Sequence, residues 1–81
     1  MRYQILKYSY KQLEQLLIGN IVNFKSDCQF FPNFDVTGKV ESMSYASNAE
    51  IIFKVRCKSK LISIGSNMHN LTFELVNSSI H

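Results

Sequence analysis

The sequence predicts a small α+β, mainly β domain in which one N-terminal helix precedes a series of short strands. Two observations support this prediction. Hydrophobic residues recur at helical spacing only near the N-terminus, and they alternate with polar residues along most of the chain that follows. With 81 residues, 46% of them hydrophobic, the chain has room for one domain with one core. We therefore expect a single domain over 1–81, with a helix at about 9–18, a β-rich part at about 20–76 and a frayed polar tail at 77–81.

The expected helix carries start and stop signals that are independent of each other. Ser9 followed three residues later by Gln12 matches a capping box, in which the two residues bond each other's backbone amides. Leu13, Leu16 and Leu17 fall on one face of a helix that begins after this cap. Gly19 stands where a residue with a left-handed backbone commonly ends a helix.

Five strands are expected after the helix, at about 20–25, 36–45, 49–57, 61–64 and 71–75. The strongest pattern belongs to the third, where Phe53, Val55 and Cys57 alternate with polar residues. Gly38 marks a bend or bulge in the second strand. Short turns separate the middle strands, whereas a longer loop at 26–35 follows the first.

Five short antiparallel strands tend to curl into a small barrel, because closure removes exposed strand edges. The long first loop, the hairpins after it and the broken turn at 65–67 resemble the layout of an SH3-like barrel. An OB-type barrel fits less well, because it usually has longer strands. The expected fold is therefore one N-terminal α-helix followed by a five-stranded antiparallel, SH3-like small β-barrel.

The overall composition indicates an intracellular binding protein. The net charge is +3 and the isoelectric point is near 9.0, so a partner with negative charge is one interpretation. Two cysteines, Cys28 and Cys57, are too few for a disulfide framework, and we expect both to be reduced, with a single bridge between them as the alternative. The N-terminus lacks the pattern of a signal peptide, and no segment has the length of a membrane span. These features predict a cytoplasmic protein without a membrane partner.

Positive charge is concentrated in one short stretch of the chain. Four of the nine basic residues lie within seven positions: Lys54, Arg56, Lys58 and Lys60. Like-facing residues of a strand are about 6.6 Å apart, which is close to the spacing of successive phosphates along a nucleic acid. We expect these residues to form a binding stripe, with Lys39 as a possible addition. The alternative is a solvated outer face that discourages strand pairing at an edge.

The loop at 26–35 contains three phenylalanines, Phe30, Phe31 and Phe34, and Tyr45 lies in a nearby hairpin. Exposed rings at these positions could stack on bases or contact a protein partner. The alternative is that some of them close one end of the barrel.

The sequence contains no recognisable arrangement for catalysis or for metal binding. The spacings between Cys28, Cys57, His69 and His81 fit no zinc pattern. The acidic residues are scattered singly, and the three glycines form no phosphate-binding loop. We therefore expect neither a cofactor nor a metal, and no enzymatic activity, a small barrel ribonuclease being the one exception considered.

The leading functional hypothesis is a small binding module that contacts nucleic acid through its basic strand face. The alternative is a protein-binding adaptor or inhibitor, of the type found among phage and mobile-element accessory proteins. Such a protein would use the basic face against an acidic surface and the phenylalanine loop as an anchor. Self-association through an uncovered strand edge is a third possibility.

Overall fold

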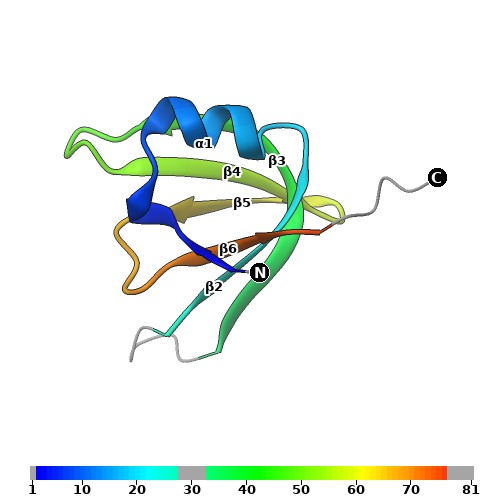
Figure 1. Ribbon diagram of the computed structural model, residues 1–81. Helices are drawn as coiled ribbons and strands as arrows, with labels where there is room; N and C mark the ends of the chain where they lie inside the picture. Colours follow the sequence, from blue (N-terminus) through cyan, green and yellow to red (C-terminus); the bar gives the residue numbers. More distant parts are fainter. Residues whose placement is uncertain (1, 28–32, 77–81) are drawn as a thin grey trace.

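The computed structural model describes residues 2–27 and 33–76, which form one antiparallel sheet, one α-helix and one 3-10 helix (Figure 1). The elements in chain order are β1 (Tyr3–Gln4), η1 (Ile5–Lys7), α1 (Tyr10–Leu17), β2 (Ile21–Ser26), β3 (Phe34–Tyr45), β4 (Ile51–Cys57), β5 (Lys60–Gly65) and β6 (Thr72–Leu75). The strand order across the sheet is β1-β6-β2-β3-β4-β5. The predicted mainly β fold with one N-terminal α-helix is confirmed.

Helix α1 begins and ends where the local signals predicted. The Ser9 side chain accepts a hydrogen bond from the Gln12 backbone amide at 3.2 Å, and the Gln12 side chain accepts one from the Ser9 amide at 2.9 Å. Gly19 has a φ of +87°, a conformation that glycine adopts without a steric penalty. Leu13 and Leu17 are fully buried, so the apolar face of α1 packs on the sheet.

Alternation of apolar and polar residues gives the sheet two different faces. The inner face is turned toward α1 and forms the core, whose largest side chains are Phe24, Phe53, Phe73, Ile5, Leu13, Leu17 and Ile64. The Phe24 and Phe53 rings are in contact, with centroids 5.5 Å apart. The outer face is the opposite one and carries polar and charged side chains.

Strand β3 is long enough to pair with a different neighbouring strand along each half of its length. Figure 1 shows that it bends along this length. Its first half pairs with β2 and its second half with β4. The register with β4 shifts between Val40 and Ser42, so Glu41 is the extra residue of a β-bulge. A Cβ atom on Gly38 would overlap the carbonyl oxygen of Arg56, so glycine allows β4 to approach β3 at this bend. The bulge therefore lies at Glu41, three residues after Gly38, where a bend or bulge was predicted.

Two expectations for the sheet differ from the structure. The described residues form six strands rather than five, because Tyr3 and Gln4 pair with Phe73 and Thr72. Among the same residues the sheet also does not close into a barrel, because β5 pairs there with β4 alone. Strand β1 occupies the edge of β6 to which β5 would have to bond for closure. The free edges of the sheet are therefore β1 and β5.

Candidate functional site

The outer face of β3 and β4 brings three predicted basic residues together. Lys39 lies directly opposite Arg56 in the ladder between these strands. Lys54 lies two residues from Arg56 along β4 and therefore shares its face. We call Lys39, Lys54 and Arg56 the basic cluster. Lys39 was predicted only as an addition to the stripe, yet the register makes it a direct neighbour of Arg56.

The Arg56 side chain is paired with a carboxylate that the β-bulge brings into reach. The Arg56 Nε donates to Glu41 Oε2 at 3.0 Å, and the Arg56 Nη2 donates to Glu41 Oε1 at 3.4 Å. This hydrogen bond from Arg56, with the attraction of the Arg56 and Lys39 charges, lowers the pKa of Glu41 below its ordinary value. The same hydrogen bond raises the pKa of Arg56. Both side chains are exposed, so the pair adds little to stability but cancels much of the Arg56 charge locally.

The two lysines of the cluster are not neutralised in this way. Among residues 2–27 and 33–76, no carboxylate lies within ion-pair distance of Lys39 or Lys54. The Lys54 ammonium group donates a hydrogen bond to Ser63 Oγ at 2.8 Å, across the ladder with β5. The basic cluster therefore holds three cations against one carboxylate and retains a net positive charge.

The other two residues of the predicted stripe lie elsewhere. Lys60 pairs with Cys57, and paired residues of two strands point to the same face. Since Cys57 is on the inner-face side of β4, Lys60 is too, and the prediction that it continues the stripe is wrong. Lys58 lies in the turn between β4 and β5 with a φ of +59°. It is exposed at the end of the sheet and is not part of either face.

The predicted aromatic residues do not join the basic cluster. Phe34 is half-buried and packs against the core, opposite Ser26 on the inner-face side. Tyr45 is 60% exposed, but its ring stacks on Tyr10 of α1, with centroids 4.6 Å apart. It therefore lies on the helix side of the sheet. Phe30 and Phe31 lie outside the described residues.

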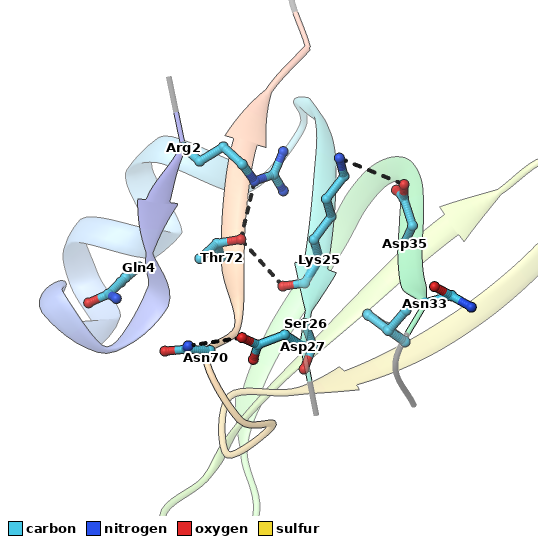
Figure 2. A pocket seen from close by; sticks show the side chains of 10 residues that line it. Arg2, Gln4, Lys25, Ser26, Asp27, Asn33, Asp35, Asn70 and Thr72 are labelled. Atoms are coloured by element: carbon cyan, nitrogen blue, oxygen red, sulfur yellow. Dashed lines mark hydrogen bonds and ion pairs between the residues drawn. The ribbon is translucent and has the colours of Figure 1, made fainter. Parts of the chain in front are cut away.

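A polar hollow of about 470 Å³ lies at the other end of the outer face, between the ends of β1, β6, β2 and β3 (Figure 2). Arg2 Nε donates to Thr72 Oγ1 at 3.2 Å, and the Thr72 hydroxyl donates to the Lys25 carbonyl at 3.4 Å. The Lys25 ammonium group is 3.9 Å from Asp35 Oδ2. Sequence reasoning missed this hollow because its residues come from four strands that are distant in the chain. Of its lining residues, only Phe34 was predicted as a site residue.

The charges around this hollow are balanced within it. Arg2 also bonds Glu74 at 2.9 Å, so each of the two cations there has a carboxylate partner. The Asn70 amide donates to Asp27 Oδ2 at 3.2 Å. Most polar groups of the hollow therefore bond one another and hold the strand ends together. The basic cluster is the stronger candidate for a binding site because its positive charge is not compensated.

In the part of the chain that the structure describes, no three His, Cys, Asp or Glu side chains lie close enough together to hold a metal ion. Cys57 is a half-buried free thiol. No described helix has both the length and the apolar character needed to cross a membrane.

Comparisons with models of known protein families, with curated proteins and with solved structures found no match to this chain.

Proposed function

We propose that this chain is a small non-catalytic module that binds nucleic acid through the basic cluster on the outer face of β3 and β4. The observation that carries the proposal is the pair of lysines, Lys39 and Lys54, which flank Arg56 without carboxylate partners of their own among the described residues. We assign its action to the cytoplasm, where a free thiol such as Cys57 stays reduced.

In this proposal the cluster contacts phosphates rather than bases. Cross-strand neighbours are about 5 Å apart and like-facing residues of one strand about 6.6 Å apart, so the three cations can contact adjacent phosphate groups. Binding of this kind releases counterions and depends little on base sequence. Stacking by Tyr45 or Phe34 is not part of the proposal, because Tyr45 is on the helix side and Phe34 packs against the core.

We also propose that the sheet is an opened variant of the SH3-like barrel. Four consecutive strands, β2 to β5, form a meander, and β6 returns to pair with β2. This order of the five longer strands supports the relationship. The additional strand β1 accounts for the open edge, since it takes the place at which closure would occur.

The test is the combined substitution Lys39→Ala and Lys54→Ala, with binding to single- and double-stranded DNA and RNA oligonucleotides measured over a salt series. We expect weaker binding at low salt and a slope of log affinity against log salt that is smaller by about 2, one for each lost phosphate contact. No binding by the wild-type chain at low salt, or an unchanged slope in the variant, would refute the proposal.

A matched control separates this cluster from a general effect of net charge. Lys7→Ala with Lys11→Ala removes the same charge from η1 and α1, outside the outer face, and should change the slope much less. Glu41→Gln tests the opposite change in charge, because it removes the carboxylate that pairs with Arg56 of the basic cluster. It should strengthen binding by up to about fivefold, since a charge 4 Å away in water is worth about 1 kcal/mol.

A protein partner is the second candidate, and one observation favours it. The exposed Tyr45 ring, held by its stack on Tyr10, is an aromatic anchor of the type enriched at protein interfaces. Tyr45→Ala distinguishes the two functions. It should leave nucleic-acid binding unchanged under the main proposal, whereas it should weaken capture of a protein partner from the native host under the second.

A further inference from the structure

Within residues 2–27 and 33–76, strand β5 ends the sheet with backbone groups that have no strand beside them. The Ser66 amide donates to the Ile51 carbonyl at 2.8 Å, which makes Ile51 and Ser66 a hydrogen-bonded pair. Such pairs alternate along an antiparallel ladder, so Ile64, Ile62 and Lys60 direct their backbone groups toward β4. Leu61 and Ser63 consequently direct theirs outward.

Beyond Lys60, whose side chain is on the inner-face side, this edge lacks the features that usually prevent strands from pairing. Between Leu61 and Gly65 there is neither a charged residue nor a proline. Leu61 is 47% exposed and Ser63 is also exposed, so the outward groups are accessible. The opposite edge of the sheet is β1, which is only two residues long and offers much less backbone for pairing.

The two ends of β5 carry opposite charges. Lys58 and Lys60 lie at its start. At its end the Glu50 carboxylate occupies the place that a Cβ atom on Gly65 would take, and it accepts a hydrogen bond from the Asn67 amide at 3.1 Å. An added strand in antiparallel orientation therefore fits best if it too is basic at its start and acidic at its end.

We propose that β5 is a self-association edge, at which two copies of this chain pair antiparallel about a two-fold axis at Ile62. In this register Leu61 faces Ser63 of the second copy. The two-fold axis repeats this pair, so the outward N–H and C=O groups of both residues in both copies form hydrogen bonds. Ser59 then faces Gly65 of the second copy, so Lys58, in the turn beside Ser59, lies near the Glu50 carboxylate of the other copy. Parallel pairing would instead bring like charges together, which disfavours it. The pairing extends one six-stranded sheet into a continuous sheet of two copies.

This inference does not depend on the proposed nucleic-acid binding. An antiparallel strand pair keeps the same face of both copies on one side, so the two basic clusters would share the outer face of the joined sheet. Dimerisation and nucleic-acid binding can nevertheless be measured separately, because the first needs no ligand.

The experiment is sedimentation equilibrium or light scattering of the full chain from about 10 μM to about 1 mM, a range that detects weak dimers. We expect the 9.4-kDa chain to form a dimer and no larger species. Ser63→Pro removes an outward amide without touching the ladder to β4, and it should weaken dimerisation by about tenfold or more. Ser63→Ala is the matched control, because it removes the bond to Lys54 but keeps the amide, and it should dimerise like the wild type.

Leu61→Lys provides a second variant that does not alter the backbone, and the charge placed at the edge should also yield a monomer. Circular dichroism and thermal unfolding verify that each variant is folded. A wild-type chain that stays monomeric at the highest concentration would overturn the proposal. So would a folded Ser63→Pro or Leu61→Lys variant that dimerises as strongly as the wild type, or a wild type that forms open-ended larger assemblies.

Discussion

Replacement of Phe53 with alanine is expected to lower the free energy of unfolding by about 3–5 kcal/mol, the usual cost of removing a buried phenylalanine. Phe53 is fully buried in the middle of β4 and packs against the Phe24 ring. A domain of this size has a total stability of only about 4–12 kcal/mol. The variant should therefore be close to unfolding at room temperature, as measured by urea denaturation followed by circular dichroism.

Ile52→Ala is the matched control for this prediction. Ile52 is the preceding residue of the same strand, but it faces the outer side and is only partly buried. Its loss should cost about 1 kcal/mol or less. Equal losses at the two positions would contradict the assignment of the inner and outer faces, and with it the location of the basic cluster.

The second large effect is expected for Gly38→Ala. The added methyl group would overlap the Arg56 carbonyl oxygen and lie 2.8 Å from the Val55 side chain. Because the first of these is backbone, β3 and β4 would have to separate at the bend. Overpacking of this kind costs about 1–3 kcal/mol, which corresponds to a fall in melting temperature of about 4–20 °C for a domain of this length.

Gly19→Ala is the control that distinguishes steric overlap from backbone strain as the cause of the stability loss in Gly38→Ala. Gly19 has a positive φ, but nothing lies within 4 Å of the place where its Cβ would be. Gly19→Ala should therefore cost only the strain of the left-handed conformation, about 1 kcal/mol. If Gly38→Ala were the milder of the two, the close approach of β4 at the bend would not exist.

The parts of the fold that depend on local chemistry were predictable from the sequence. The capping box of Ser9 and Gln12 and the terminal Gly19 define α1 without reference to the rest of the chain. Alternation along β4 likewise identified Phe53 and Val55 as core residues. Strand β1 was missed because Tyr3 and Gln4 are both exposed and show no alternation, so only their pairing with β6 makes them a strand.

The candidate site was only partly predictable, for two geometric reasons. Counting alternate residues through the turn after Cys57 assigned Lys60 to the outer face. A two-residue turn instead pairs Cys57 with Lys60 and places both on the same face. The ion pair of Arg56 joins β4 to Glu41 of β3 at the bulge, where the register shifts by one residue. Such a shift leaves no signal in the alternation of β4 itself.

The hydrogen bonds of Arg2 have a consequence for the order in which the chain folds. Arg2 bonds Thr72 and Glu74, so it joins segments about 70 positions apart, whereas β2 to β5 are joined by connections between consecutive strands. Closing so long a loop is entropically costly, and β1 contributes only two residue pairs once it is closed. We expect the meander to form first and β1 to dock last and open first. Hydrogen exchange should then be faster at the backbone amides of β1 than at those of β4, and equal protection of the two strands would exclude this order.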